Sequence, residues 1–521
     1  MSNPDLHSDT YTVAGAFRTM CRWNAGSELI IDGELRYTGA RLAYEAACVA
    51  ESLQRAGIMT GDRVAFLGAN SARYFAAFFG AHLAGATTCN IHPRETPAFL
   101  GLTLRRLNAR AIVCDADQLE KISAVRHALP DGLFVLSLGD ATPALADLSF
   151  DDAVENGSGR IEDIAAVISP DDLAVVILSS GSTGTPKGIL HSQSNFVRWM
   201  RATPALFGHV ERGTRFLVIV GTSFAAWPFS AVSIIYAGGT LILMREFNPE
   251  AFCAIVERER VTMAGPVPTM IRMLEPSITS RYDLSSFRMM LCAGEPPSPS
   301  DIERILSWAD TDIRCLYLAS ESAPGAATLW QLRDQTELRK PVCAGRPVPG
   351  ADVRIVDPDG TIRDVLPAGQ SGEIVLRGPT ISLGYLDSPE LTAQRFVDGW
   401  WRSGDLGHLD TDGFLYVEGR TDNTINTGGI KVQGEEVELC LLAHPGVLQA
   451  AVIGVPDPKW GKRIDAFVAI GRGVGVDDLF AHCRAQLAAF KVPKNITVLD
   501  KLPVGATGKL DRMSLRKEYG Q

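Results

Sequence analysis

Short apolar runs alternate with helix-length segments in the first part of the chain, and this pattern leaves few folds open. Apolar runs begin at Val64 and Ala111, and longer segments follow them at 72–84 and 118–129. Strands that alternate with helices predict a parallel sheet covered on both faces. The same pattern returns with apolar runs near Phe216, Thr240, Val261, Arg288 and Ile313. The sequence therefore predicts two similar α/β lobes.

The pattern changes after residue 345, where short strands are separated by Gly, Pro and Asp. These strands are expected at 352–356, 373–377 and 414–418, as in a small β-barrel or distorted sheet. From Ile430 onward, helix and strand mix again over a length sufficient for a separate small domain. We expect an α/β protein with a large N-terminal domain, 1–421, of two parallel-type α/β lobes plus a small β-barrel. A small mobile α+β C-terminal domain, 422–521, follows it.

Composition excludes several kinds of partner. The net charge is -10 and no long basic run occurs, which argues against nucleic acid or an anionic membrane as a partner. The charge-free stretch between Arg215 and Arg245 is interrupted by Pro228 and two glycines, so we predict strand, helix, strand (216–220 and 240–244) and no membrane span. The ten cysteines lie singly along the chain, and residues 1–10 are polar without a signal-peptide pattern. Reduced thiols in a cytoplasmic enzyme fit both observations.

One loop has the composition of a phosphate-binding site. It joins an apolar run at 173–178 to another at 188–191, and its glycines let backbone N–H groups turn toward an anion. Hydroxyl groups add donors, and Lys187 adds a positive charge. The predicted phosphate-binding residues are Ser180, Gly181, Ser182, Thr183, Gly184, Thr185 and Lys187. Because Lys187 lies between Pro186 and Gly188, the spacing differs from that of a P-loop and disfavours a kinase or P-loop ATPase.

Two further candidate segments follow predicted strands. Ligands bind beyond the carboxyl ends of strands in open α/β sheets. A strand ending at Leu291 leads into Cys292-Ala-Gly-Glu-Pro, where Gly294 leaves room for a flat ring. A strand ending near Leu316 leads into Tyr317-Leu-Ala-Ser-Glu, which offers an aromatic face, a hydroxyl and a carboxylate. Either segment alone could equally be a solvated loop.

Three more motifs lie in the second half of the chain. Trp401-Arg-Ser-Gly-Asp405 carries a carboxylate, which can accept hydrogen bonds from hydroxyl groups, and Gly419-Arg420-Thr-Asp422 carries a cation. The third ends in Gly508-Lys509. Each is a weak signal by itself, because Gly-Asp marks turns and most lysines are surface charges. In their order and spacing, however, the six motifs between 178 and 509 resemble those of the adenylate-forming superfamily. It comprises acyl-CoA synthetases, luciferases and peptide-synthetase adenylation domains, and the chain is most like an acyl-CoA synthetase.

The resemblance implies a site for ATP and Mg²⁺. Tyr317 would stack on adenine, Ser320 would contact the α-phosphate, and Glu321 would hold Mg²⁺. Asp405 would accept hydrogen bonds from both ribose hydroxyls, and Arg420 would contact the nucleotide. Besides the phosphate loop, the implied nucleotide residues are Gly294, Glu295, Pro296, Tyr317, Ser320, Glu321, Asp405 and Arg420.

The resemblance also implies two half-reactions with coenzyme A as the acceptor. A carboxylate attacks the α-phosphate of ATP to give acyl-AMP and pyrophosphate, and a thiol then displaces AMP. The catalytic residues would be Lys187, Glu321 and Lys509, the last bridging the carboxylate and the phosphate oxygens. Asp422 would be the hinge about which the C-terminal domain rotates between the two steps. The rotation would bring Gly428, Gly429 and Lys431 toward the incoming thiol.

The acid-binding pocket is expected to be apolar and uncharged. Its implied residues are Ser223, Phe224, Trp227, Pro266, Gly294, Leu318, Ala319 and Ala323. No Asp lies near Phe224 to hold an α-ammonium group, and no His lies close to Ser223 as in many aryl-activating members. Asn426 stands where many coumarate-type ligases have Lys. An uncharged aromatic or medium-chain carboxylic acid is therefore the expected substrate.

Two other functions share these motifs. A stand-alone adenylating enzyme would load an acyl or peptidyl carrier protein and would differ only in the thiol acceptor. A nucleotide-binding protein without ligase activity is disfavoured because Lys509 and Glu321 are both present. The expected partners are a small carboxylic acid and either coenzyme A or a carrier protein, and the chain is expected to be a monomer or homodimer.

Overall fold

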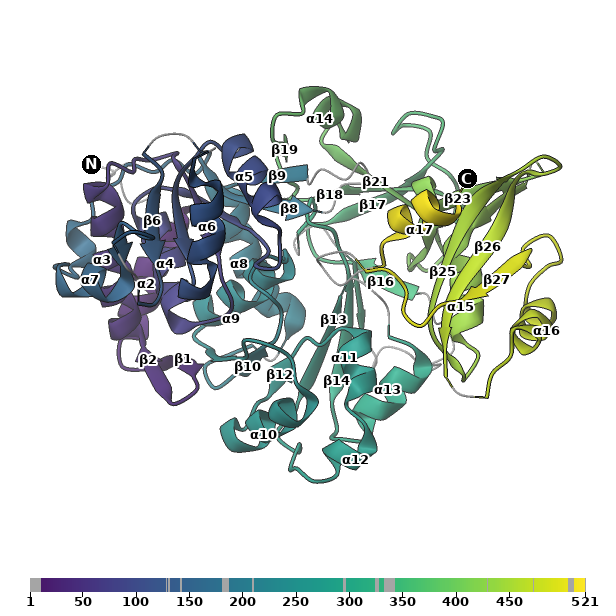
Figure 1. The fold of residues 1–521 in the computed structure, drawn as a ribbon, viewed down its shortest axis with the longest axis horizontal. Helices are drawn as coiled ribbons and strands as arrows, with labels where there is room; N and C mark the ends of the chain where they lie inside the picture. The colour runs from purple at the N-terminus through teal and green to yellow at the C-terminus, as the bar shows by residue number, and fades with distance from the viewer. Residues whose placement is uncertain are drawn as a thin grey trace. The chain divides into compact units, whose positions relative to one another are not determined.

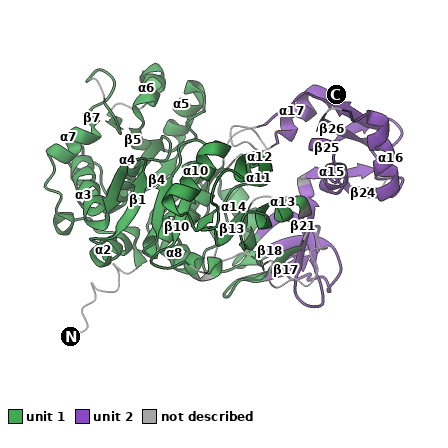
Figure 2. Ribbon diagram, turned by 90° about the horizontal axis from the view of Figure 1, so that it is seen from below, with its two compact units in different colours: residues 1–352, 376–401 green, residues 353–375, 402–521 purple. Residues whose placement is uncertain are grey.

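The computed structural model describes residues 11–520 except 128, 130–131, 141–142, 180–186, 209, 294–296, 324–327, 332–342, 429, 472 and 505–509. Two compact units divide the chain (Figure 2). Unit 1 comprises residues 1–352 and 376–401, and unit 2 comprises residues 353–375 and 402–521. Residues 353–375 and 402–421 thus pack with the C-terminal part of the chain. The expected boundary at Asp422, between residues 1–421 and a mobile domain of residues 422–521, stays a prediction.

The first sheet of unit 1 contains the strands predicted in the first part of the chain (Figure 1). Its order is β19 (Gly384–Tyr385), β9 (Lys187–Ser192), β8 (Leu173–Ser179), β4 (Thr87–Asn90), β3 (Arg63–Leu67), β5 (Ala109–Cys114), β6 (Phe134–Ser137) and β7 (Leu148–Ser149). Strands β8, β4, β3, β5, β6 and β7 are parallel to one another. Strand β9 pairs antiparallel with both β8 and β19. The helices include α3 (Gly39–Arg55), α4 (Ala72–Leu83), α5 (Pro97–Arg106) and α6 (Leu119–Arg126). The predicted alternation is confirmed.

The second sheet of unit 1 is also parallel in its centre. Its order is β2 (Leu35–Thr38), β1 (Glu28–Asp32), β11 (Thr240–Leu243), β10 (Arg215–Val218), β12 (Met263–Ala264), β13 (Met289–Ala293), β14 (Asp312–Tyr317), β15 (Thr328–Gln331) and β16 (Cys343–Pro347). Strands β1, β11, β10, β12, β13 and β14 are parallel to one another, whereas β2, β15 and β16 pair antiparallel with their neighbours. Both sheets therefore combine a parallel centre with antiparallel strands at an edge.

The charge-free stretch folds as predicted. Between β10 and β11 lie a π-helical turn, Pro228–Val232, and α9 (Ser233–Tyr236). No helix among the described residues is both long and apolar enough to cross a membrane. All ten cysteines are free thiols, in agreement with their single spacing.

Helix α4 lies at the centre of the core of unit 1. Ser71 caps it by accepting a hydrogen bond from the backbone N–H of Tyr74. Every residue of α4 except Arg73 is buried, so the helix is apolar on all sides and not only along one stripe. A Cβ on Gly80 would lie 2.7 Å from the carbonyl oxygen of Ala46 in α3, so only glycine lets these two helices approach so closely.

Unit 2 begins with the strands β17 (Asp352–Val356), β18 (Gly372–Arg377), β21 (Trp400–Leu409) and β22 (Leu415–Arg420). They are neighbours in that order, with β17 at an edge. The residues expected to form a small β-barrel thus form an open sheet, because β17 and β22 do not pair to close it. The positions of β17, β18 and β22 were predicted within two residues, whereas β21 was not among the predicted strands.

The C-terminal part of unit 2 has the predicted α+β composition. Its sheet has the order β24 (Ile430–Gln433), β23 (Thr424–Thr427), β26 (Gly461–Ile470) and β25 (Val447–Asp457), with β27 (Asn495–Val498) parallel to β26. The helices are α15 (Gly434–Leu442), α16 (Val476–Gln486) and α17 (Arg512–Tyr519). Apolar side chains of α15 and α16 pack with those of β25 and β26 in a core of their own, which includes Val437, Leu479, Val452 and Ala466.

A buried histidine in α4 predicts a pH-dependent stability. His82 is fully buried between the rings of Phe78 and Phe196, and burial lowers its pKa to about 3. The unfolded chain binds the proton near pH 6.5, so below that pH the unfolded state holds more protons than the folded state. The free energy of unfolding should therefore fall with pH below 6.5, by up to about 1.4 kcal/mol per pH unit from this group.

The variant His82→Phe keeps the ring but cannot titrate. Chemical unfolding followed above and below pH 6.5 should show a shallower pH slope than the wild type. The same change at the exposed His127 is the control. An unchanged slope in His82→Phe would contradict the assignment of a neutral buried imidazole.

Candidate active site

Lys187 lies at the start of β9, directly after the predicted phosphate loop. Strands β8 and β9 are antiparallel, and Ser179 is opposite Lys187. The loop residues Ser180, Gly181, Ser182, Thr183, Gly184 and Thr185 lie outside the described residues. The Lys187 Nζ atom is 5.6 Å from the centre of the Tyr385 ring, within the range of a cation–π interaction.

The turn after β14 carries the predicted adenine and metal residues. Tyr317 ends the strand and is half-buried, and Ser320 and Glu321 follow it. The backbone N–H of Ala319 donates to Ser322 Oγ at 2.9 Å, and the N–H of Ala323 donates to the carbonyl of Ala319 at 3.0 Å. These bonds close a tight turn.

Ala323 ends this turn in a left-handed conformation with φ of +52° and is fully buried. Such a conformation costs a non-glycine residue of order 1 kcal/mol or more, so the surrounding contacts must stabilise it. The turn is therefore held in one conformation, which fixes the place of Glu321.

Three hydrogen bonds hold this turn from outside. The Tyr385 hydroxyl donates to Glu321 Oε1 at 3.0 Å, and the backbone N–H of Ser382 donates to the Glu321 carbonyl at 2.8 Å. His191 Nε2 lies 2.8 Å from the carbonyl oxygen of Ser320. Because a carbonyl only accepts, the His191 ring carries its proton on Nε2.

Burial determines the protonation of the two ring side chains. It lowers the pKa of the fully buried His191 to about 4, so the imidazole is neutral at physiological pH. Burial, followed by the charge of Glu321, raises the pKa of Tyr385 well above its usual value. The hydroxyl therefore remains a donor to the carboxylate.

The predicted ribose motif lies on β21 in unit 2. Asp405 is opposite Arg420 in the β21–β22 pair, and Arg420 Nη1 donates to Asp405 Oδ1 at 2.8 Å. The strand pairing thus places the two predicted nucleotide residues side by side, and their roles in binding stay a prediction.

Glu373 fixes the backbone of this motif, a function that the sequence analysis missed. Its buried carboxylate accepts from the backbone N–H of Gly404 at 3.1 Å and from Arg402 Nε at 2.8 Å. Ser403 Oγ donates to the carbonyl of Ile374 at 2.6 Å. Glu373 lies in β18, far away in the sequence, so no local pattern could have revealed it.

The hinge and thiol segments are also in unit 2. Asp422 lies in a short 3₁₀ turn, Thr421–Asn423. Gly428 follows β23 with φ of +61°, and its N–H donates to the Trp460 carbonyl at 2.8 Å. Lys431 lies in β24 opposite Asn426, whereas Gly429 and Lys509 lie outside the described residues.

The predicted acid-pocket residues follow neighbouring parallel strands of the second sheet of unit 1. Ser223 and Phe224 come after β10, Pro266 comes after β12, and Leu318, Ala319 and Ala323 come after β14. Strands β10, β12, β13 and β14 are adjacent in that order, so these loops share one edge of the sheet. Gly294, and with it Glu295 and Pro296, lies outside the described residues.

Trp227 occupies a different environment from the expected pocket. Its ring is fully buried against Tyr74, Phe75 and Phe78, and Nε1 donates to Asn70 Oδ1 at 2.8 Å. A side chain enclosed in this way belongs to the hydrophobic core. Trp227 is therefore a core residue and not a residue of the acid-binding pocket.

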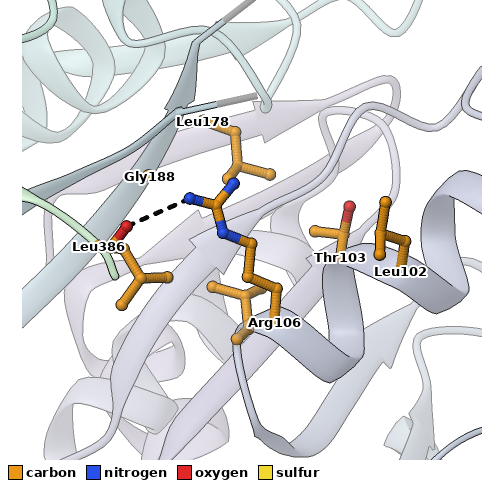
Figure 3. A pocket seen from close by; sticks show the side chains of 7 residues that line it. Leu102, Thr103, Arg106, Leu178, Gly188 and Leu386 are labelled. Carbon is orange, nitrogen blue, oxygen red and sulfur yellow. Dashed lines mark hydrogen bonds between the residues drawn. The ribbon is translucent and has the colours of Figure 1, made fainter. Parts of the chain in front are cut away.

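A small cavity beside the end of β8 and the start of β9 is not an acid-binding pocket (Figure 3). Leu178, Gly188, Leu386 and Arg106 are among its lining residues, and Arg106 Nη2 donates to the Leu386 carbonyl at 3.2 Å. Its volume of about 20 Å³ has room for a water molecule, whereas ligand pockets hold several hundred Å³.

The described residues fit Mg²⁺ held mainly by a nucleotide. They include no group of three or more His, Cys, Asp or Glu that could hold a metal ion by themselves. Mg²⁺ commonly takes one or two carboxylates together with phosphate oxygens and water. Glu321 alone is sufficient for that kind of binding.

Comparison with known proteins identifies the class of enzyme. Residues 17–386 match the AMP-binding enzyme family, and residues 436–509 match the AMP-binding enzyme C-terminal domain. The chain therefore belongs to the AMP-binding enzyme family. The predicted membership of the adenylate-forming superfamily, as a ligase of the acyl-CoA synthetase type, is confirmed.

Relatives match the chain over almost its whole length. It is 33% identical over 493 residues to a feruloyl-CoA synthase of an Amycolatopsis species, which covers 94% of this chain and 95% of the relative. It is 29% identical over 489 residues to a long-chain-fatty-acid–CoA ligase of Mycobacterium tuberculosis, with coverage of 93% and 94%. The solved structure of the anthranilate CoA ligase AuaEII in complex with anthranoyl-AMP has a TM-score of 0.87 at 25% identity and covers 97% of each chain.

The position of Asp405 predicts a specific loss of ribose recognition. If its carboxylate accepts from both ribose hydroxyls, Asp405→Asn should weaken ATP binding by about 10-fold or more, since hydrogen bonds to charged groups contribute roughly 1.5–3 kcal/mol. The wild type should also prefer ATP over 2′,3′-dideoxy-ATP, and the variant should lose that preference. Calorimetric binding of both nucleotides measures this.

The matched control is Asp410→Asn in the turn between β21 and β22. Asp410 accepts hydrogen bonds from the N–H groups of Asp412 and Phe414 and from the Tyr416 hydroxyl, and it belongs to no nucleotide motif. Discrimination between the two nucleotides that persists in Asp405→Asn would remove Asp405 from the ribose site.

Proposed function

We propose that this enzyme uses ATP to convert an uncharged aromatic or medium-chain carboxylic acid to its acyl-AMP, releases pyrophosphate, and transfers the acyl group to the thiol of coenzyme A. One observation carries the proposal. Tyr385 contacts both of the predicted catalytic side chains of unit 1, Lys187 and Glu321. Residues that are far apart in the sequence thus lie around one tyrosine.

The charges of the site suit adenylation. When the acid attacks the α-phosphate, negative charge increases on the phosphate oxygens, and cations placed beforehand stabilise it without reorganisation. Lys187 supplies one such cation, and Glu321 would hold Mg²⁺, which supplies the other charge when bound. Lys509 would bridge the acid carboxylate and the phosphate, which reduces their mutual repulsion.

Hydrogen bonds around Asp422 support a hinge at this position. The Thr421 hydroxyl donates to the Gly404 carbonyl in β21 at 2.9 Å. Asn423, on the other side, accepts from Arg516 Nη2 of α17 at 3.0 Å and donates to Glu435 Oε1 of α15 at 2.9 Å. The chain thus changes its bonding partners within two peptide bonds, which suits rotation of residues 422–521 as one body.

An exposed aromatic side chain among cations favours coenzyme A as the acceptor. Trp460 is 40% exposed, with Lys459 Nζ at 4.8 Å and Lys494 Nζ at 6.0 Å from its ring centre. An adenine ring can stack on such a surface while lysines neutralise phosphates. Gly428 of the predicted thiol segment packs against the same ring, where a Cβ would lie 2.8 Å from Trp460 Cε3.

A carrier protein remains the second candidate, because the same lysines could bind an acidic domain. The two acceptors differ in what they need from Trp460. A nucleotide needs the exposed ring for stacking, whereas an acidic surface needs mainly the lysines Lys459 and Lys494. The effect of removing only the ring therefore distinguishes the two acceptors.

The acid is proposed to be uncharged because the segment 222–227 around Phe224 contains no acidic or basic residue. The neighbouring His92 ring lies 6.0 Å from Phe224, and burial, Arg94 and Lys121 lower its pKa. It is therefore a neutral polar group at physiological pH. Two of the similar proteins are named for aromatic acids and one for long-chain fatty acids, which supports an aromatic or aliphatic acid as the substrate.

A cytoplasmic location is proposed because all ten cysteines are free thiols.

The products of ATP cleavage test the proposal directly. With a panel of aryl, medium-chain and amino acids, we expect AMP and pyrophosphate to form, and acyl-CoA to form only when coenzyme A is added. Free α-amino acids should be poor substrates, because burying an ammonium group without a counter-charge costs several kcal/mol. Release of ADP and phosphate, or a preference for a standard amino acid, would refute the proposal.

Two variants should separate the half-reactions. Lys509→Ala should slow acyl-AMP formation by about 10²- to 10³-fold, because it removes a cation from the developing phosphate charge. Trp460→Ala should leave acyl-AMP formation intact and raise the KM for coenzyme A about 10-fold or more, as expected for a lost stacking contact. Rapid-quench measurement of acyl-AMP and steady-state measurement of acyl-CoA provide the two readouts.

Trp23→Ala is the control for Trp460→Ala, because Trp23 is also exposed, at 67%, and belongs to no motif. An unchanged KM for coenzyme A in Trp460→Ala, together with efficient loading of a carrier protein, would favour the second candidate. An equal loss of both half-reactions in Lys509→Ala and Trp460→Ala would contradict the proposal that Lys509 serves acyl-AMP formation and Trp460 serves coenzyme A binding.

A further inference from the structure

Tyr385 contacts both predicted catalytic groups of unit 1, although it belongs to none of the six motifs. Its hydroxyl donates to Glu321 Oε1 at 3.0 Å, and its ring centre lies 5.6 Å from Lys187 Nζ. The side chain is 6% exposed. A buried tyrosine that touches one anion and one cation can determine where both are placed.

The position of Tyr385 follows from strand pairing with β9. Strand β19 runs antiparallel to β9, with Tyr385 opposite Ile189. The N–H groups of Leu383 and Leu386, which flank β19, donate to the carbonyls of Leu190 and Gly188 at 2.8 and 2.7 Å. Because β9 begins with Lys187, the same strand places the tyrosine ring and the lysine.

The direction of the Tyr385 hydroxyl is also determined. Trp401 Nε1 lies 3.4 Å from the hydroxyl oxygen, and an indole N–H can only donate. The tyrosine oxygen therefore accepts from Trp401, and its own proton points to the Glu321 carboxylate. The edge of the Phe396 ring packs against the tyrosine ring at 5.5 Å between centroids.

The backbone of Glu321 does not depend on this hydroxyl. The N–H of Ser382 holds the Glu321 carbonyl at 2.8 Å, and Thr380 Oγ1 donates to the Ser322 carbonyl at 2.7 Å. Ser382 and Thr380 are both buried. The tyrosine hydroxyl thus acts on the carboxylate group alone, so its removal should leave the turn in place.

We propose that Tyr385 is a positioning residue that holds the Glu321 carboxylate in one orientation for the metal through its bond to Oε1, and that fixes Lys187 beside it. The inference rests on the proposed function and deepens it. A carboxylate that can rotate can bind a metal through either or both oxygens, whereas one with a fixed oxygen offers a single geometry. Mg²⁺ requires near-ideal octahedral geometry, so this restriction favours it.

The test measures Mg²⁺-dependent nucleotide binding and needs no turnover. Tyr385→Phe removes the hydroxyl and keeps the ring over Lys187. A non-hydrolysable ATP analogue is titrated calorimetrically at a series of Mg²⁺ concentrations. The Mg²⁺ concentration that gives half of the maximal gain in analogue affinity should rise about 10-fold or more, as expected for a lost hydrogen bond to a charged group. Affinity for the analogue without metal should stay unchanged. Tyr385→Leu also removes the ring, so it should weaken metal-free binding as well.

Two controls make the test specific. Tyr416→Phe removes another hydroxyl that donates to a carboxylate, that of Asp410 at 3.2 Å, and should change neither quantity. In a Glu321→Gln background, Tyr385→Phe should have no further effect on the Mg²⁺ requirement, because coupled residues are not additive. Thermal unfolding of each variant confirms that it is folded.

Wild-type Mg²⁺ dependence in Tyr385→Phe would overturn the inference and leave Tyr385 as a packing residue. An equal loss of metal-free and metal-dependent binding in Tyr385→Phe would do the same. These outcomes are distinct from failure of the proposed function, which would show as absent pyrophosphate release by the wild type with every acid. The binding titration would still report on Tyr385 in that case.

Discussion

The hydrogen bond from His191 Nε2 to the Ser320 carbonyl joins the two sheets of unit 1 at the place where their motif residues lie. His191 is in β9 of the first sheet, and Ser320 follows β14 of the second. His191 is fully buried and Ser320 is half-buried, and an unpaired polar group on the buried side would cost about 1–3 kcal/mol. The bond is therefore needed for packing as well as for the site. Together with the Tyr385 hydroxyl and the Ser382 N–H, the imidazole fixes the turn that carries Glu321.

Other buried polar side chains join the same sheets in the same way. Asn70, which follows β3, donates to the carbonyls of Val220 and Met244, which follow β10 and β11. Asn90, at the end of β4, donates to the carbonyl of Thr222 at 2.7 Å. Strands lose their pairing partners where they end, so their last carbonyls need other donors. These ties lie at the carboxyl ends of the strands, where open α/β sheets bind ligands, and so they make the ligand-binding edge rigid.

The predicted catalytic groups need this rigidity, because electrostatic stabilisation requires charges that are in place before the reaction. Lys187 rests against an aromatic ring, Glu321 accepts from a hydroxyl, and Asp405 pairs with Arg420. In unit 2, buried Glu373 fixes the Gly404 amide next to Asp405. Each charged group of the candidate site that the structure describes thus has a partner, which keeps it from adopting other rotamers. We expect preorganisation of this kind to contribute more to the rate than any single contact.

Much of this protein was determined by local sequence. Apolar runs and glycine-rich breaks placed β8, β9, β14 and α4 within a residue or two, and the six motifs identified the superfamily. Local pattern could not show that β9 turns back antiparallel, or that Trp227 lies in the core, because both depend on residues far away in the sequence. The same holds for Tyr385, His191 and Glu373, whose roles are contacts with distant residues. The types of side chain in a motif can be read from local sequence, because each ligand atom needs a particular kind of group. The position of that side chain is decided only when distant strands pair and their buried polar groups find partners.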